Sequence, residues 1–537
     1  MFDYIIVGGG TAGSVLAGRL SQDPTVKVCL LEAGGADSSV LIHCPAGLAL
    51  LAQTGGANWK FDTVPQAGLN GRIGYQPRGK VLGGSSSINA MCYIRGQAQD
   101  YDHWEQQGNP GWGWNDLLPY FKKSETNERA ATGDFAQWHG TTGPLNVMDL
   151  RSPNRFGPAF IEAAVQAGYP RNNDFNGAQQ EGVGMYQVTH KNGERWSVAK
   201  GYLTPHIQPG SARANLQVIT NAFTTKIIFE GTRAVGVAYT QGGQTKEVRA
   251  SREVLLCAGA LQSPQLLMAS GVGPADHLQA LSINVVHHSV GVGQHLHDHP
   301  DIVQVVDAPK LTDLFGVSPT GLWSALKGIM QWRNERSGML TTNFAEAGAF
   351  FKSSPAQATP DLQLHFVIGK LVDHGRKPTF GHGYSCHLCL LQPQSRGSLR
   401  LASSDMKVAP LIDPNFLSHP DDMARMVSGF KQMRAILQSP ALAQYGGREL
   451  DTTAKAVTDA QIEAVIRNKA DTIYHPVGTC RMGPTDNDPV DAQLRVKGVQ
   501  GLRVVDASIM PRIVSGNTNA PTVVIAEKAF DLLRAAA

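Results

Sequence analysis

The chain has 537 residues, 42% of them hydrophobic and 17% charged, which predicts two packed domains of a folded α/β protein rather than a disordered or fibrous chain. The formal net charge is +3 and the 47 basic residues are scattered, which argues against a nucleic-acid-binding surface. Seven cysteines are too few for a disulfide framework, which leads us to expect a cytoplasmic protein, and no apolar run reaches the roughly 18 residues of a membrane span. Because a glycine motif begins at Gly8, removal of a signal peptide would destroy the first structural element, so we expect the N-terminus to be mature.

A strand, a glycine-rich turn and a helix open the chain. Residues 2–7 are an apolar strand, and Gly8, Gly10 and Gly13 form a GxGxxG motif before the helical pattern of SVLAGRLSQ. A second apolar strand over 26–31 ends at Glu32. Glycine lets the backbone turn sharply and approach a pyrophosphate at the helix N-terminus, while the acidic residue accepts a hydrogen bond from a ribose hydroxyl. This unit predicts a dinucleotide-binding site.

The rest of the chain divides into segments that differ in predicted secondary structure. Residues 34–125 are rich in loops, which is typical of segments that line a ligand. Strands with turns between them follow over 217–257. Residues 305–470 alternate strands with an amphipathic helix near 420–438 and contain no dinucleotide motif, which predicts a separate substrate domain. The tail, from 502 onward, is again strand, loop and helix.

Four further segments carry a resemblance to a known family. GKVLGGSSSINAMCYIRGQAQDYD at 79–102 and GALQSPQLLMASGVG at 259–273 resemble the two signatures of the glucose-methanol-choline (GMC) family of FAD oxidoreductases. The C-terminal YHPVGT and NTNAPT extend the resemblance towards residue 530. The segments WSVAKGYL, YHPVGTCRMG and RVVDASIMP are most similar to the bacterial branch of aliphatic alcohol and choline dehydrogenases.

The resemblance implies an α/β fold of two discontinuous domains. A Rossmann-like FAD-binding domain is expected from residues 1–155, 191–304 and 470–537. A substrate-binding domain with a mixed or antiparallel sheet flanked by helices is expected from residues 156–190 and 305–469. The active site is expected at their interface, where cofactor sites commonly lie.

The resemblance also implies which residues hold FAD. They lie in the N-terminal unit, the 79–102 signature, the middle strands and the C-terminal motifs. The expected contacts are Gly8, Gly10, Thr11, Ala12, Gly13, Glu32, Ala33, Trp59, Arg78, Gly79, Leu82, Gly83, Gly84, Ser85, Asn89, Ala90, Thr224, Ala258, Asp506, Ala507, Pro521 and Thr522. Family members with covalent flavin carry a histidine where this chain has Ile88, so we expect non-covalent FAD.

His475 in YHPVG and Asn519 in NTNAP match the catalytic pair of the family. Oxidation of an alcohol by a flavin requires removal of the hydroxyl proton as hydride leaves the carbinol carbon. An imidazole with a pKa near neutrality suits that proton transfer, and an amide can orient the substrate oxygen and the ring. We therefore expect His475 as base and Asn519 as its partner.

The expected reaction is oxidation of a primary, medium-chain aliphatic alcohol to the aldehyde, with electrons passed to a quinone-type acceptor. Choline dehydrogenase is the alternative, for which Glu346, Phe344 and Phe350 would supply part of a trimethylammonium pocket. An oxidase that uses oxygen and a hydroxynitrile lyase are further alternatives within the same fold.

Two histidine or cysteine patterns are interpreted as structural. HLHDHP at 295–300 resembles a metal cluster but falls where the family closes its FAD domain, and Cys386 and Cys389 form a lone CxxC within a strand pattern. We therefore expect no metal site.

Residues 311–332 are apolar around much of a helix and are flanked by Lys310, Arg333 and Arg336. We expect a helix or lid over the substrate mouth, with peripheral contact to the inner face of the cytoplasmic membrane as the alternative role.

Overall fold

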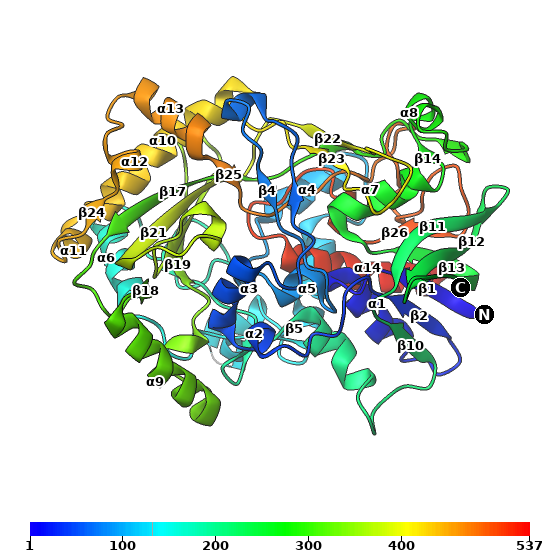
Figure 1. Ribbon diagram of the computed structural model, residues 1–537, viewed down its shortest axis with the longest axis horizontal. Helices are drawn as coiled ribbons and strands as arrows, with labels where there is room; N and C mark the ends of the chain where they lie inside the picture. Colours follow the sequence, from blue (N-terminus) through cyan, green and yellow to red (C-terminus); the bar gives the residue numbers. More distant parts are fainter. Residues whose placement is uncertain (132, 537) are drawn as a thin grey trace.

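The computed structural model describes residues 1–131 and 133–536, and two sheets organise it (Figure 1). The first sheet has seven strands in the order β10-β2-β1-β13-β12-β11, with β26 also paired to β13. Its strands are β1 (Phe2–Val7), β2 (Val28–Leu31), β10 (Leu216–Ile219), β11 (Phe223–Glu230), β12 (Arg233–Gln241), β13 (Gln244–Leu256) and β26 (Leu502–Val504).

Strand β13 takes part in both antiparallel and parallel pairing. Its first half pairs antiparallel with β12, and its second half lies parallel to β1 and β26. The sequence predicted strands with turns between them over 217–257, but residues 244–256 form one continuous strand. Parallel strands are buried on both faces and are accordingly apolar, as Ile5, Ile6, Leu255 and Leu256 are here.

Helices cover the first sheet and reach it from distant parts of the chain. Helix α14 packs on α1, and α5 packs on α14. The helices of this half are α1 (Thr11–Leu20), α4 (Ala98–Gln106), α5 (Trp114–Ser124), α7 (Gly259–Ala269), α8 (Ala275–Ala280) and α14 (Asn519–Ala536). Both chain ends lie beside this sheet (Figure 1).

The second sheet has eight strands in the order β24-β17-β21-β20-β19-β7, with β18 paired to β21 and β25 to β17. All of its pairs are antiparallel. The strands are β7 (Gly182–Met185), β17 (Pro300–Asp307), β18 (Gly316–Val317), β19 (Ala345–Phe351), β20 (Leu362–Val367), β21 (Gly381–Leu390), β24 (Arg448–Glu449) and β25 (Asp471–Thr472).

One face of the second sheet is covered by helices, chiefly α6 and α10. Because side chains alternate along a strand, Leu364 and Phe366 of β20 join this helix-covered core, while His365 between them faces the opposite side. The helices of this half are α6 (Phe156–Gln166), α9 (Pro319–Glu335), α10 (Pro420–Leu437), α11 (Pro440–Ala443), α12 (Asp451–Ala454) and α13 (Asp459–Lys469).

The two halves exchange chain segments. The expected boundary at 304/305 falls inside β17, and β25, from the segment expected in the FAD domain, pairs with β17 in the second sheet. A short sheet of β16 (Gln294–Leu296), β22 (Gly397–Arg400) and β23 (Leu411–Asp413) lies beside α7. Across the part of the chain that the structure describes, none of the helices is both long and apolar enough to cross a membrane.

The N-terminal βαβ unit has the predicted shape, although α1 begins at Thr11, earlier than expected, so that Gly13 lies inside it. Gly8 has a φ of +101°, a conformation that favours glycine. The backbone N–H groups of Gly9 and Gly34 donate to the Glu32 carboxylate over 2.8 and 2.7 Å. The turn, the helix start and the acidic residue therefore form one hydrogen-bonded unit.

Replacing Gly13 by alanine is expected to lower the free energy of unfolding by about 1–3 kcal/mol, because the added Cβ would lie 1.9 Å from the carbonyl oxygen of Gly8. Gly10→Ala is the matched control, since its Cβ would have no neighbour nearer than 3.8 Å. Urea unfolding of both variants without cofactor measures the difference. Equal stabilities would contradict the close helix–strand approach.

Glu32 is expected to make stability depend on pH. Burial raises its pKa from 4.5 to about 7, although the N–H groups of Gly34 and Gly9 and nearby Lys80 oppose the shift. The native chain therefore keeps this proton in a pH range where the unfolded chain has lost it. Its contribution is fully present below pH 4.5 and is lost as the pH rises through about 7.

Between these pH values the wild-type protein without cofactor should lose about 3 kcal/mol relative to Glu32→Gln, which has no such proton to release. Urea unfolding of both proteins across this range measures the difference in slope. Parallel stability curves would show that Glu32 ionises normally.

Candidate active site

A cavity of about 1510 Å³ lies between the two sheets and is lined by residues from both. This volume exceeds the roughly 300–1,000 Å³ of a common small-molecule pocket, so the cavity has room for a dinucleotide and a substrate together.

Most of the residues predicted from the sequence line this cavity. They come from the glycine turn, the 79–102 segment, β11 and the C-terminal loops. The predicted residues at the wall are Gly8, Gly10, Thr11, Ala12, Glu32, Ala33, Trp59, Arg78, Gly79, Gly84, Ser85, Asn89, Ala90, Thr224, Ala258, His475, Asp506, Ala507, Asn519 and Thr522.

Four predicted residues, Gly13, Leu82, Gly83 and Pro521, do not line it. Gly83 instead donates its N–H to the carbonyl of Gly9 over 2.7 Å, and the Leu82 side chain packs against Gly9. Gly83 and Leu82 therefore lie behind the wall and contact the turn that faces the cavity.

The nucleotide end of the cavity fits a dinucleotide. Two glycine loops approach each other closely, since a Cβ on Gly84 would lie 2.8 Å from the Cα of Gly10. Gly10, at the N-terminus of α1, has no side chain to cap the first N–H groups, so these are available to an anionic group. Buried Glu32 faces the same space. The bare backbone and the acidic residue match a pyrophosphate and a ribose.

At the other end, two antiparallel segments bring histidines together. The pairing of β17 with β25, continued by backbone hydrogen bonds between His297 and Val477, aligns residues 297–301 with 471–477. The Nδ1 atoms of His299 and His475 lie 3.0 Å apart. Tyr474, the residue before the expected base, has a φ of +75°, which is uncommon outside glycine.

His475 is a neutral imidazole in this setting. Burial lowers its pKa well below 6.5, and the neighbouring His299, His365 and Arg78 lower it further. Its Nε2 atom lies 3.3 Å from the amide nitrogen of Asn517. The pKa is thus lower than the near-neutral value expected from the sequence, and the uncharged ring can accept a proton from a bound hydroxyl.

The structure places Asn519, the expected partner of His475, at the cavity wall, but in another hydrogen bond. Asn519 begins α14, and its Oδ1 accepts a hydrogen bond of 2.8 Å from Thr11 of the glycine turn. The amide beside His475 belongs to Asn517, two residues earlier. The motif NTNAP contains both asparagines. Which of the two side chains lies beside His475 depends on the path of the loop before α14, which the sequence motif does not specify.

Sequence reasoning missed three other histidines. His299, in the segment interpreted as structural, contacts His475. His365 of β20 and His387 of β21 are directly paired neighbours and line the cavity. His365 is buried, and neither of its ring nitrogens has a hydrogen-bond partner among the described residues. The alternation in LQLHFVI, with a polar residue between core leucine and phenylalanine, is the signal that would have located it.

Arg195 is a further buried residue that the sequence did not single out. Its guanidinium donates to the carbonyl and side-chain oxygens of Asn89 over 2.7 and 2.9 Å, and to the carbonyl of Ile42. These bonds fix Asn89 at the cavity wall, next to Ile88, which also lines it.

The suggested trimethylammonium pocket does not form. The carboxylate of Glu346 is buried, accepts hydrogen bonds of 2.6 Å from Asn154 and Thr342, and does not line the cavity. Phe344 lines the cavity but Phe350 does not. Among the described residues at the cavity wall, Glu32 and Asp506 are the only carboxylates, and Asp506 is bonded to Gly259, Ser263 and Ser508.

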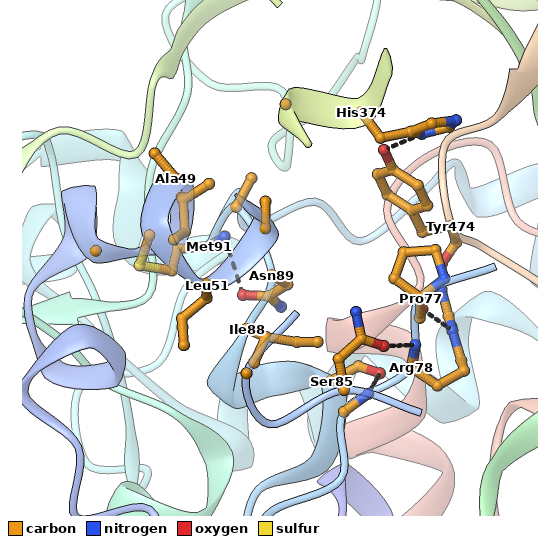
Figure 2. Close-up of a pocket in the computed structure, with 18 of the residues that line it drawn as sticks. Ala49, Leu51, Pro77, Arg78, Ser85, Ile88, Asn89, Met91, His374 and Tyr474 are labelled. Carbon is orange, nitrogen blue, oxygen red and sulfur yellow. Dashed lines mark hydrogen bonds between the residues drawn. The ribbon is translucent and has the colours of Figure 1, made fainter. Parts of the chain in front are cut away.

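The outer part of the cavity is apolar. Helix α3 (Leu48–Thr54), helix α9 and the loop around His374 form its wall. Figure 2 shows Ala49 and Leu51 on one side, His374 and Tyr474 on the other, and Ile88 and Asn89 between them. His374 bonds to the Tyr474 hydroxyl over 2.6 Å, which joins this wall to the segment that carries His475.

Comparisons with known proteins agree over nearly the whole chain. Two models described as GMC oxidoreductase match residues 2–301 and 393–526. An alcohol dehydrogenase (acceptor) of Pseudomonas putida is 49% identical, over 99% of this chain and 96% of that protein. The mitochondrial choline dehydrogenase of Homo sapiens is 43% identical, over 99% and 90%.

Among solved structures, pyridoxine 4-oxidase from Mesorbium loti superimposes with a TM-score of 0.87 at 32% identity, covering 100% of this chain and 99% of that one. The matched ranges contain the glycine turn, the 79–102 segment and the C-terminal histidine motif, and the superposition covers both sheets. The chain therefore belongs to the GMC oxidoreductase family of FAD-dependent flavoenzymes.

Proposed function

We propose that this chain oxidises primary, medium-chain aliphatic alcohols to aldehydes, with non-covalently bound FAD and a quinone-type acceptor. The observation that carries the proposal is a neutral base, His475, at the inner end of an apolar chamber that has no carboxylate of its own. When bound, FAD supplies the hydride acceptor. Ile88 offers no side-chain atom that would bond covalently to a flavin, which supports dissociable cofactor.

The roles of the protein side chains follow from their chemistry. His475 takes the hydroxyl proton at Nε2. Asn517, whose amide nitrogen lies beside that atom, orients the substrate oxygen. The apolar wall holds the alkyl chain and excludes water from the reacting carbon.

Charge at the chamber favours an uncharged alcohol over choline. A trimethylammonium group requires an aromatic or anionic partner. Phe315 and Phe344 line the outer wall, but among the described residues no carboxylate does. The ionisable side chains of this wall are basic, and they include Lys370, Lys377 and His374. We therefore rank choline dehydrogenase below aliphatic alcohol dehydrogenase.

Anaerobic mixing of the purified yellow protein with 1-octanol, benzyl alcohol and choline tests the proposal. We expect 1-octanol to bleach the flavin absorbance, and choline to leave it unchanged. The colour should then return slowly in air and rapidly with a soluble quinone. Bleaching by choline alone would make the protein a choline dehydrogenase, rapid recovery in air would make it an oxidase, and no bleaching by any alcohol would favour a lyase.

Variants of the site serve as controls for this measurement. His475→Ala should slow bleaching by about 10²–10⁴-fold, the usual contribution of a general base. Asn517→Ala should slow it by about 10–100-fold, because the substrate oxygen loses its orienting donor. Asn519→Ala should instead weaken FAD retention, since that side chain bonds to Thr11 in the glycine turn. The reverse pattern would restore Asn519 as the partner of the base.

The mouth of the chamber opens through an exposed apolar surface. Trp323 and Met330 of α9 are 61% and 67% exposed, and Phe380, which also lines the cavity, is 80% exposed. Leu322 and Ile329, on the same helix, are exposed and also line the cavity. We infer that this surface, formed by α9 and Phe380, dips into the membrane interface, with Lys327 and Arg333 of α9 contributing positive charge towards anionic lipid.

Co-sedimentation with vesicles of anionic and neutral phospholipid tests this contact. The double substitution Trp323→Glu and Met330→Glu should reduce vesicle binding about tenfold or more, because two charges enter the interface. Neither residue lines the cavity, so bleaching by soluble alcohols should persist. Val457→Glu, at a 75% exposed apolar residue elsewhere, is the matched control. Equal binding by all three proteins would show that the surface has another role.

A further inference from the structure

The contact between the two histidines at the active site requires that one ring donates a hydrogen bond and the other accepts it. The Nδ1 atoms of His299 and His475 are 3.0 Å apart, and the two rings are nearly perpendicular, at 88°. At this distance, one nitrogen donates a hydrogen and the other accepts it with a lone pair. The geometry of the pair alone does not say which ring donates.

The hydrogen-bond partner of the other nitrogen of His299 identifies which ring donates. Its Nε2 lies 2.9 Å from the main-chain carbonyl oxygen of Leu391. A carbonyl only accepts, so His299 carries its hydrogen at Nε2. Burial lowers the pKa of His299 to about 4, although hydrogen bonds to the Leu391 and Val514 carbonyls oppose the shift, so the ring is neutral. With its hydrogen at Nε2, the Nδ1 atom bears the lone pair.

His475 is therefore the donor in the pair, and its hydrogen is on Nδ1. Its Nε2 then carries the lone pair, where it accepts from the amide nitrogen of Asn517 at 3.3 Å. The opposite tautomer would place two lone pairs face to face across 3.0 Å and direct an N–H at an amide N–H₂. We propose that His299 is a positioning residue that fixes His475 in the tautomer with a basic Nε2 towards the substrate.

Backbone contacts hold the two rings in this register. One carboxylate oxygen of Asp298 accepts the N–H of His299 over 2.8 Å and the N–H of His475 over 3.0 Å. His299 is not a proton relay, because its far N–H ends at a carbonyl that takes no proton. It acts as an orienting group behind a base, in the manner of the buried acid behind the histidine of a serine protease. This inference rests on the proposed role of His475 as base.

Two substitutions of His299 separate tautomer control from packing. His299→Asn keeps an acceptor oxygen near the Nδ1 position, whereas His299→Leu fills similar space without one. His297→Leu is the control, because His297 is equally buried, accepts from Ile513 and lies beside the Pro393 carbonyl, but does not contact His475. Flavin content and thermal unfolding of each variant report whether it folds.

The direct measurement is the ¹⁵N spectrum of histidine-labelled protein, with the His475 signal identified by its loss in His475→Gln. We expect the Nδ1-protonated form in wild type and in His299→Asn, and a mixture of tautomers in His299→Leu. A wild-type His475 protonated at Nε2 would overturn the proposal.

The kinetic measurement is the limiting rate of flavin reduction by 1-octanol together with its half-saturation concentration. His299→Leu should lower the rate about 10²–10³-fold with little change in half-saturation, and His299→Asn should recover most of it. Equal losses in His299→Leu and His297→Leu, or in His299→Leu and His299→Asn, would reduce His299 to packing. If 1-octanol reduces the flavin of His475→Ala at the normal rate, the proposed role of His475 as base fails, while the ¹⁵N spectrum still tests the tautomer separately.

Discussion

The active site depends on one buried carboxylate. Asp298 accepts hydrogen bonds from the main chains of His299 and His475 with one oxygen, and from the side chains of Thr472 and Gln76 with the other. Burial raises its pKa, and the hydrogen bonds from Thr472, Gln76 and His475 oppose that shift, as does the charge of nearby Arg78. A buried charge persists only when its lone pairs are satisfied. The hydrogen bonds that satisfy this carboxylate link three segments that are far apart in sequence, around residues 76, 298–299 and 472–475.

The joint lies where the two sheets exchange strands. Strand β17 continues directly from the segment that carries Asp298 and His299, and β25 leads directly into His475. The glycine turn and Glu32 come from the first sheet, and the neighbouring histidines come from the inner face of the second. Binding of the nucleotide and reaction of the alcohol are thus assigned to different halves, with the base at the boundary between them.

Local pattern was enough to predict which residues of the N-terminal unit line the cavity. Gly8, Gly10 and Glu32 act through backbone geometry within one βαβ unit, so their spacing in sequence fixes their spacing in space. The family resemblance extended this to residues such as Arg78 and Ser85 at the cavity wall, and the predicted fold class and family are confirmed.

The histidine end required long-range information. The position of Asn517 relative to Asn519 depends on how the chain enters α14, and the contact of His299 with His475 depends on a pairing across some 170 residues of sequence. His365 faces the cavity because β20 is central in a sheet whose strands are drawn from residues 182–472. Alternation within that strand was visible in the sequence, but which of its faces meets the cavity was not.

The outer wall of the chamber is built from α3, α9 and the His374 loop, which belong to neither sheet. Substitutions there change the shape offered to an alcohol without altering the strands that support the histidines or the glycine turn. Homologues with this architecture can therefore differ in which alcohol they bind while they catalyse the same reaction. Among paralogues of this chain, differences in side-chain volume on α3 and α9 should therefore be interpreted as a change of substrate preference rather than of reaction.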